Sequence, residues 1–412
     1  MAKIIPFRAI RPVADKVHLV ATRSYVSYSR PNLYRKLHEN PYTFIHVINP
    51  EFSMGLKPRR GAKRFRLVRD KFQDFCERGI LEHDETPSFY IYRQIQPRDS
   101  FTGLICGISV DDYLNGTIKV HEQTLTRREK LFQKYLDVCN FNAEPVLLTY
   151  PDDSGVDEMV ERALEQRPLY DFSTTDHLRH QLWAVNDPKM VDYITSQFTH
   201  HESIYIADGH HRSASSALLG KVRRKLNPGY SGQEMFNYIM ACLIPESQLS
   251  IYDFNRVVKD LNGHTAEAFI ELLKGDFDVV RQKRMYQPER LHEMSMYLKG
   301  SWYALRLRET PEATSVTSSL DAHILSEKVL RPILGIEDLK TDARIEFVSG
   351  KVGMDGLAIY AVKKKMEVAF GLFPVTTHQL KAVSDAGEIM PPKTTWIEPK
   401  LRSGLTIMSL DD

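Results

Sequence analysis

The sequence predicts a mixed α/β protein of the α+β kind, because short apolar runs alternate with helical patterns from end to end. Its length of 412 residues is enough for two or three domains at roughly 100–200 residues each. The chain contains no internal repeat and no low-complexity tract. We therefore expect an N-terminal α/β region at 1–150, a central core region at 151–262 and a C-terminal α/β region at 263–412.

Each element is predicted from the spacing of its apolar residues. Period-two alternation or a short β-branched run indicates a strand, and apolar residues at i, i+3 and i+4 indicate a helix. The expected strands are 17–22, 43–49, 88–95, 103–110, 145–149, 178–185, 203–207, 236–244, 249–258, 293–308 and 367–373. The expected helices are 66–81, 125–139, 155–166, 213–219, 265–275, 320–333 and 376–386. On the strand expected at 43–49, we interpret His46 as structural and not catalytic.

Composition excludes several classes of protein. Lys plus Arg is 55 and Asp plus Glu is 53, so the net charge of +2 provides no broad basic field for a nucleic acid. The four cysteines contain no CxxC pair, which argues against a disulfide scaffold and a cysteine zinc site. The N-terminus lacks the apolar core of a signal peptide, and the apolar stretch 238–245 is too short to span a bilayer. We expect a cytoplasmic protein without a membrane partner.

The sharpest local feature is the run Asp208–Arg212, which reads Asp-Gly-His-His-Arg between a buried strand and a helix. Gly209 permits a tight turn, and a helix N-terminus presents free N–H groups. The two imidazoles and the guanidinium can donate to anionic oxygens, and Asp208 can orient a histidine or hold Mg²⁺. These features predict a phosphate site. The alternatives are histidines that only cap and pack, or a transition-metal site, although no HExxH-like set is nearby.

A second cluster, Lys119–Thr124, follows a strand-like run and precedes a charged helix. Here Glu122, beside His121, has the chemistry of a general base for a hydroxyl proton. The alternative is a helix-start motif in which Thr124 is the N-cap.

A third stretch, residues 390–404, is kept extended by its Pro-Pro and Glu-Pro steps. Its basic residues Lys393, Lys400 and Arg402, together with Trp396, could line an anionic ligand. The alternative is a rigid strap packed on the body of the protein.

The run Tyr205–Ala214 resembles the signature of a bacterial family catalogued as a domain of unknown function, number ten-fifteen. The resemblance extends over nearly the whole chain, through several motifs in the same order. These motifs are Phe7–Pro12, Asn40–Glu51, Gly103–Tyr113, Lys119–Thr124, Leu169–Phe172, Asp253–Arg256 and Met390–Gly404.

Through its Gly-His-His-Arg corner, this family is similar to the ParB/sulfiredoxin-like superfamily, which includes kinases of free L-serine. The resemblance implies a ParB/sulfiredoxin-like nucleotide-binding core with large elaborations. It also implies an ATP- or ADP-dependent, Mg²⁺-requiring kinase that makes O-phospho-L-serine. The implied catalytic residues are a glutamate base, Asp208 and His211, with Asp208 also as the Mg²⁺ ligand. The resemblance does not fix the position of the base, for which we take Glu122, with Glu51 as the reserve. The implied phosphate-binding residues are Gly209, His210, Arg212 and Ser213, and further ligand-binding candidates are His121, Thr124, Lys393 and Arg402.

One departure from the family concerns the stretch Arg23–Ser27, where relatives carry Pro-Tyr-Asp-Val and this chain has no acid around Tyr25. Its absence predicts altered specificity or lost activity. Sulfiredoxin chemistry is disfavoured because His210 stands where that activity needs a cysteine. The rival functions are a nucleotide-binding regulatory module and a phosphate-ester hydrolase. The expected partners are a nucleotide and a small molecule, the free amino acid serine. A nucleic acid is not expected, and the protein could form a homodimer.

Overall fold

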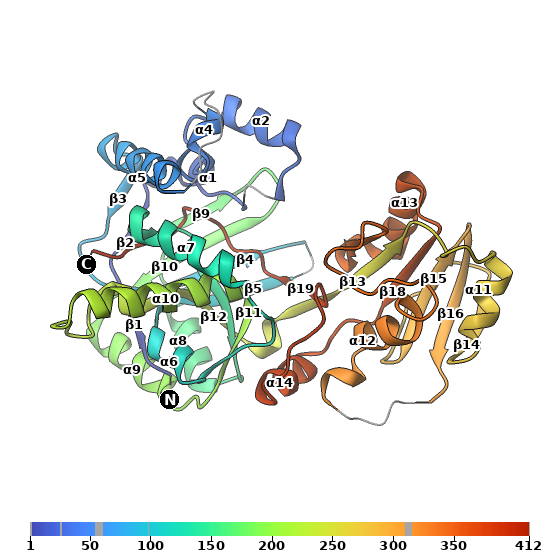
Figure 1. Ribbon diagram of the computed structural model, residues 1–412. Coiled ribbons are helices and arrows are strands. Elements are labelled where there is room, and N and C mark those ends of the chain that lie inside the picture. Colours follow the sequence, from blue (N-terminus) through green and yellow to red (C-terminus); the bar gives the residue numbers. More distant parts are fainter. Residues whose placement is uncertain (1, 25–26, 54–60, 98, 310–314, 412) are drawn as a thin grey trace. The chain divides into compact units, whose positions relative to one another are not determined.

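The computed structural model describes residues 2–24, 27–53, 61–97, 99–309 and 315–411. The chain forms two compact units, each described here by itself (Figure 1). The first unit contains residues 1–120, 124–249 and 399–412, and the second contains 121–123 and 250–398. The expected division into three consecutive regions stays a prediction.

The first unit is built on a mixed nine-stranded sheet. The strand order is β6-β11-β8-β12-β5-β4-β10-β9, with β1 paired to β5. Two pairs are parallel, β6 with β11 and β8 with β12, and the other neighbours are antiparallel. The strands are β1 (Ile4–Ile5), β4 (Phe89–Ile95), β5 (Ser100–Ser109), β6 (Ile118–Lys119), β8 (Val146–Tyr150), β9 (Tyr170–Ser173), β10 (Arg179–Val185), β11 (Ile204–Asp208) and β12 (Tyr238–Pro245).

Helices pack on this sheet through small and apolar side chains. Ile91, Leu148 and Leu243 of the sheet form one core cluster with Met159 and Phe198 from the helices. The buried first half of α10 is rich in Ser and Ala, which allows α7 to lie close beside it (Figure 1). The helices are α6 (Val110–Leu114), α7 (Thr126–Cys139), α8 (Ser154–Leu164), α9 (Pro188–Phe198) and α10 (His210–Leu226), with the short η2 (Met235–Asn237) and η3 (Glu246–Gln248).

A smaller four-stranded sheet, in the order β3-β2-β20-β7, completes the first unit. In it β2 pairs with β20, so Ala9 stands opposite Met408. The strands are β2 (Ala9–Pro12), β3 (Leu81–His83), β7 (Phe141–Asn142) and β20 (Ile407–Ser409). The helices that precede and follow them are α1 (Val17–Val20), α2 (Arg30–Glu39), α3 (Ile45–Ile48), α4 (Pro50–Ser53) and α5 (Ala62–Glu77).

The strands expected at 17–22 and 43–49 are wrong, because both segments form short helices, α1 and α3. Phe44 and Val47 are three residues apart, and both are fully buried in one core cluster. A spacing of three places two side chains on the same helical face, whereas in a strand they would point to opposite faces. The ring of His46 shares a 3.0 Å hydrogen bond between Nε2 and the Asn40 carbonyl, as a structural residue would. Tyr25 lies outside the described residues.

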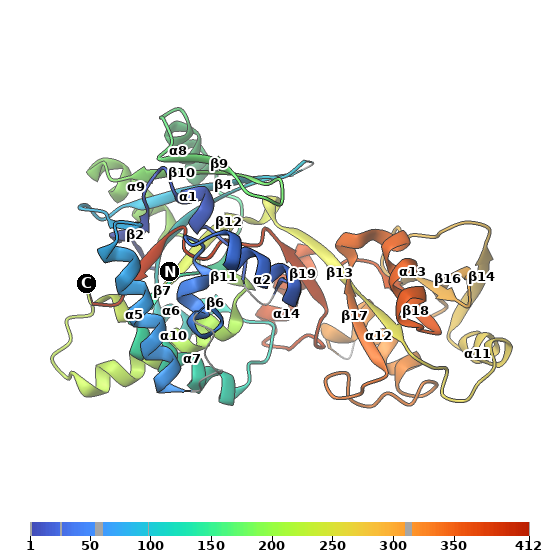
Figure 2. The same ribbon diagram turned by 90° about the horizontal axis from the view of Figure 1, so that it is seen from above.

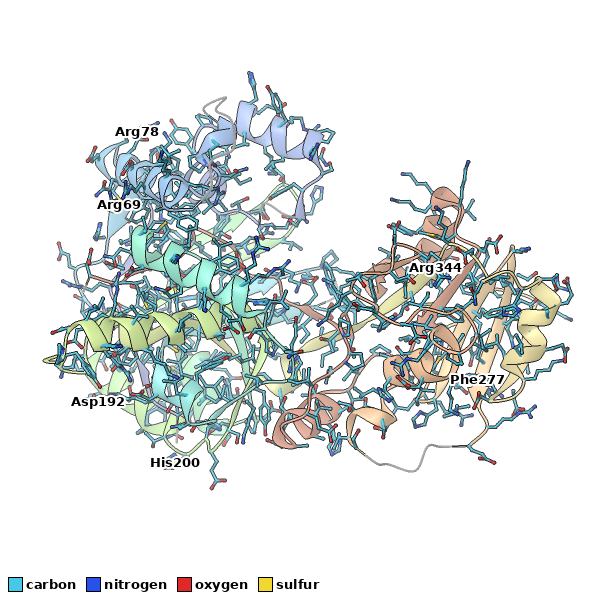
Figure 3. All side chains as sticks on the ribbon, in the orientation of Figure 1. Arg69, Arg78, Asp192, His200, Phe277 and Arg344 are labelled. Atoms are coloured by element: carbon cyan, nitrogen blue, oxygen red, sulfur yellow. The ribbon has the colours of Figure 1, made fainter. Side chains whose placement is uncertain are left out.

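The second unit has a seven-stranded sheet in the order β14-β16-β15-β18-β13-β17, with β19 paired to β13. Helices α11 and α13 pack on β14 and β18, and the labelled Phe277 is fully buried at the start of β14 (Figures 2 and 3). The strands are β13 (Ser250–Val258), β14 (Phe277–Gln282), β15 (Glu293–Leu298), β16 (Ser301–Leu307), β17 (Ile345–Ser349), β18 (Val368–Leu372) and β19 (Thr395–Glu398). The helices are α11 (Ala266–Leu273), η4 (Thr317–Ser319), α12 (Asp321–Leu325), η5 (Ser326–Leu330), η6 (Gly350–Val352), α13 (Gly353–Lys364) and α14 (Thr377–Asp385).

The expected α/β class is confirmed, since helices and strands alternate in both units. Among the described residues, none of the helices has the length and apolar character needed to cross a bilayer.

Candidate functional site

The predicted strand-turn-helix corner is present: β11 ends at Asp208, and α10 begins at His210. Between them, Gly209 has φ +108° and ψ 26°, a left-handed conformation that residues with a side chain rarely adopt. A Cβ atom at Gly209 would lie 3.0 Å from Val146 Cγ1 and 3.3 Å from Arg212 Cζ. Glycine is therefore required here both for its backbone conformation and for the space around it.

Asp208 is an ionised carboxylate at this corner. Its Oδ2 atom lies 3.0 Å from Lys400 Nζ, and the two side chains are 41% and 35% exposed. Desolvation by burial opposes the charge, but Lys400 and Arg212 together hold the pKa of Asp208 below its ordinary value. The carboxylate therefore carries a full negative charge at neutral pH, and it is one of the oxygen groups that Mg²⁺ prefers.

The Arg212 guanidinium lies beside Gly209 at the helix start, where the loop that precedes β8 holds it. Its Nη1 atom donates to the carbonyl of Pro145 at 2.6 Å and lies 2.9 Å from the Glu144 carboxylate. Glu144 accepts a second hydrogen bond at 2.7 Å, from Ser403 Oγ. The guanidinium is thus fixed by several oxygens, and its predicted role as a phosphate ligand stays a prediction.

The two histidines of the corner differ in their surroundings. His210 is buried, whereas His211 is partly exposed. Burial lowers the pKa of His211, as does Arg128, while Glu129 acts in the opposite direction. The imidazole is therefore neutral at pH 7. Its buried Nδ1 atom has no hydrogen-bond partner among the described residues.

Ser213 is directed into the helix and not toward a ligand. Its side chain is buried, and its Oγ donates to the Gly209 carbonyl at 3.2 Å. This bond holds the first turn of α10 against the left-handed glycine. A direct phosphate contact by the Ser213 hydroxyl stays a prediction.

Strand β6, which ends at Lys119 at the start of the Lys119–Thr124 cluster, leaves the sheet at the same edge as the corner. Strand β6 runs parallel to β11, with Lys119 opposite Tyr205, and parallel neighbours have their carboxyl ends on one side. Val120 and Thr124 belong to the first unit, whereas the three residues between them group with the second.

Within this cluster, His121 is buried, and desolvation lowers its pKa to about 4, which keeps the ring neutral. Glu122 is exposed. Thr124 is not the N-cap of α7, as the sequence had suggested, because Leu125 occupies that position without a side-chain cap bond. The Thr124 hydroxyl instead donates to Glu129 in the first turn of the helix.

The segment 399–404, by which the chain re-enters the first unit, is called here the return segment. Its Arg402 side chain is 2% exposed, and Nη2 lies 2.8 Å from Asp176 Oδ2. Burial works against the charge of Asp176, but Thr174 and Arg402 lower its pKa to about 2. Arg402 therefore forms a strong ion pair with Asp176, which lies in the β9–β10 loop.

Two other predicted residues have different partners. Lys393 belongs to the second unit, where its Nζ lies 5.3 Å from the centroid of the Phe254 ring. Glu51, the reserve base, is buried and pairs with Arg64 Nε at 3.2 Å. This ion pair favours a structural role for Glu51.

Sequence reasoning did not identify Lys400 as the partner of Asp208, nor Glu144 as the partner of Arg212. The basic pattern of residues 390–404 was a signal for Lys400, because it pointed to an anionic partner. Glu144 gave no signal, since a single acid in a short loop is ordinary.

The described residues contain no group of three or more His, Cys, Asp or Glu side chains that could hold a metal ion. A single carboxylate such as Asp208 nevertheless suits Mg²⁺, which usually takes one or two carboxylates plus phosphate oxygens and waters.

Comparison with solved structures finds proteins of low similarity. A mutant of a free serine kinase in complex with ADP is 14% identical, with a TM-score of 0.38 and coverage of 73% of this chain and 92% of that one. SbnI with a C-terminal truncation, from Staphylococcus aureus, is 14% identical, with a TM-score of 0.39 and coverage of 74% and 87%. A conserved hypothetical protein from Pyrococcus furiosus is 15% identical, with a TM-score of 0.34 and coverage of 75% and 96%.

No curated protein sequence matches the chain. A family profile described as "Protein of unknown function (DUF1015)" matches residues 4–323. This match covers well over half of the chain and confirms the family that the resemblance indicated. The chain therefore belongs to the DUF1015 family.

Proposed function

We propose that this protein is a small-molecule kinase that binds ATP or ADP at the Asp208–Ser213 corner and phosphorylates free L-serine. The observation that carries the proposal is the ionised Asp208 beside Lys400, at the point where Gly209 opens the N-terminus of α10. The choice of serine as acceptor rests on the resemblance of the Gly-His-His-Arg corner to the free serine kinases.

The corner offers donors for phosphate oxygens. The first turn of a helix has N–H groups without partners inside the helix, and its dipole favours an anion there. At the same turn, the buried Nδ1 atom of His211 has no hydrogen-bond partner within the part of the chain that the structure describes. A phosphate group would accept from these N–H groups and from a protonated Nδ1. When bound, Mg²⁺ would neutralise part of the phosphate charge, with Asp208 as its protein ligand.

The transfer step needs a base for the acceptor. The serine hydroxyl oxygen forms a bond to the terminal phosphorus as the bridging P–O bond of the nucleotide breaks. The hydroxyl proton passes to the carboxylate of Glu122, and ADP leaves when ATP is the donor, or AMP when ADP is. Glu122 is chosen because it is an exposed carboxylate beside His121, in one of the motifs in which the chain resembles its family.

The direct test is to incubate the purified protein with Mg²⁺, L-serine and either ATP or ADP, and to measure phosphoserine by mass spectrometry. We expect product that depends on both serine and nucleotide. Correctly folded protein that makes no phosphoserine would refute the kinase proposal. Release of phosphate that does not depend on serine would favour a hydrolase instead.

Two variants and a control sharpen this test. Glu122→Gln should abolish transfer but retain nucleotide binding, whereas Asp208→Asn should weaken both. Asp171→Asn is the matched control, because Asp171 is also a partly exposed acid paired with a cation, Arg179, at 2.6 Å. It removes the same charge from the same unit, and it should leave turnover unchanged.

A further inference from the structure

The return segment is held firmly in the first unit just after Lys400, at residues 402–404. Ser403 exchanges two backbone hydrogen bonds with Thr22, at 2.7 and 3.1 Å, and the Gly404 N–H donates to the Ala143 carbonyl at 2.8 Å. Arg402 is buried against Asp176. The backbone that follows Lys400 is therefore fixed, and the long side chain of Lys400 can change partner without moving it.

The two cations near Asp208 are not equivalent. Arg212 is bound by the Pro145 carbonyl and by the carboxylate of Glu144. Moving it toward a ligand would break several charge-assisted contacts at once. Lys400 forms a partly exposed pair with Asp208, and pairs of this kind shift an equilibrium by only about fivefold or less. Its ammonium is also a compact charge on a flexible stem.

We propose that Lys400 is a nucleotide-binding residue that exchanges its partner when the site fills. In the free protein its ammonium neutralises Asp208. When nucleotide binds, the ammonium moves to a phosphate oxygen, and Asp208 becomes available to Mg²⁺. This inference rests on the proposed function, because it assumes that nucleotide phosphates bind at the corner.

The exchange follows from charge. An ammonium 3.0 Å from Asp208 Oδ2 and a divalent cation on the same carboxylate repel each other, so the two compete for Asp208. A nucleotide–Mg²⁺ complex removes the conflict, because it brings its own oxygens for the ammonium. Lys400 lies beyond residues 4–323, so the DUF1015 match does not include it. The segment outside the matched region thus supplies one cation of the site.

The experiment measures two affinities that should change in opposite directions. In Lys400→Met, the dissociation constant for ADP with Mg²⁺, measured by calorimetry, should rise about 10- to 100-fold, as for a lost hydrogen bond to a charged group. The same variant should bind Mn²⁺ alone, measured by electron paramagnetic resonance, more tightly than the wild type. A merely structural lysine would not move the two constants in opposite directions.

Further variants keep the outcome clear. Lys400→Arg retains the charge and should restore most of the ADP affinity. Lys351→Met is the matched control, because Lys351 is also a half-exposed lysine paired with an acid, 3.0 Å from Glu398, and it should leave both constants unchanged. Wild-type protein that binds ADP as tightly as Lys400→Met would refute the role of Lys400 and leave the proposed function standing. Wild-type protein that binds no ADP would refute both.

Discussion

Replacing Gly209 by alanine tests whether the corner depends on its left-handed turn. A φ of +108° costs a residue with a Cβ atom about 1–2 kcal/mol. The new methyl group would also lie 3.0 Å from Val146 Cγ1 and 3.3 Å from Arg212 Cζ, and overpacking of this kind typically costs ~1–3 kcal/mol. The two terms together predict a loss of about 3 kcal/mol in the free energy of unfolding.

The matched control is Gly116→Ala in the same unit. Gly116 has φ +85°, but nothing lies within 4 Å of a Cβ atom built there. This control should lose only the conformational term, about 1–2 kcal/mol. Urea unfolding of the two variants and the wild type isolates the crowding against Val146 and Arg212. Equal losses in the two variants would show that the close approach at Gly209 is unimportant, and the reasoning from the geometry would then be wrong.

Three further predictions concern buried charge. Burial, with Arg402, lowers the pKa of His180 to about 3. Below pH 6.5 the unfolded chain therefore binds a proton at His180 that the native state does not bind. Stability should therefore fall by about 2 kcal/mol from pH 7 to pH 5 on this account, and His180→Gln should flatten the urea midpoint over that range. Arg402→Met should lower the free energy of unfolding by up to about 2 kcal/mol at pH 7. This loss should shrink below pH 4, because protonation of Asp176, whose native pKa is about 2, removes the charge that Arg402 stabilises. An unchanged difference between variant and wild type at pH 3 would contradict this. Arg256 is fully buried, and its Nε and Nη2 atoms have no hydrogen-bond partner among the described residues. Arg256→Met should therefore raise the free energy of unfolding by ~1–3 kcal/mol and raise the thermal midpoint. A lower midpoint would show that the buried charge is compensated.

The sequence was sufficient to predict the corner itself. Ile204 and Ile206 alternate as a strand requires, and Asp208 with Gly209 marks the turn before a helix. These signals are local, so they do not depend on the rest of the chain. The same holds for the helix at α7 and the strand at β8, each within a residue or two of its predicted bounds.

The parts that could not be predicted depend on distant partners. The short apolar run that contains Phe44 and Val47 fits a strand or a helix equally well, and only its burial against other elements selects the helix. Likewise, nothing local indicates that Arg212 is bound to Glu144 and that Lys400, far along the chain, pairs with Asp208. Charge pattern identified the residue types of the site, but their pairing is a property of the tertiary structure.

The pairing of Ala9 with Met408 has a consequence for synthesis of the protein on the ribosome. Strand β2 emerges from the ribosome long before its partner β20, because residues 13–406, which include the whole of the second unit, lie between them. At roughly 5–20 residues per second, β2 waits tens of seconds with one edge unpaired, and such edges attract other chains. Loss of β20 would make this delay permanent, so we expect protein that is truncated before Ile407 to aggregate during expression, even though the lost strand is short.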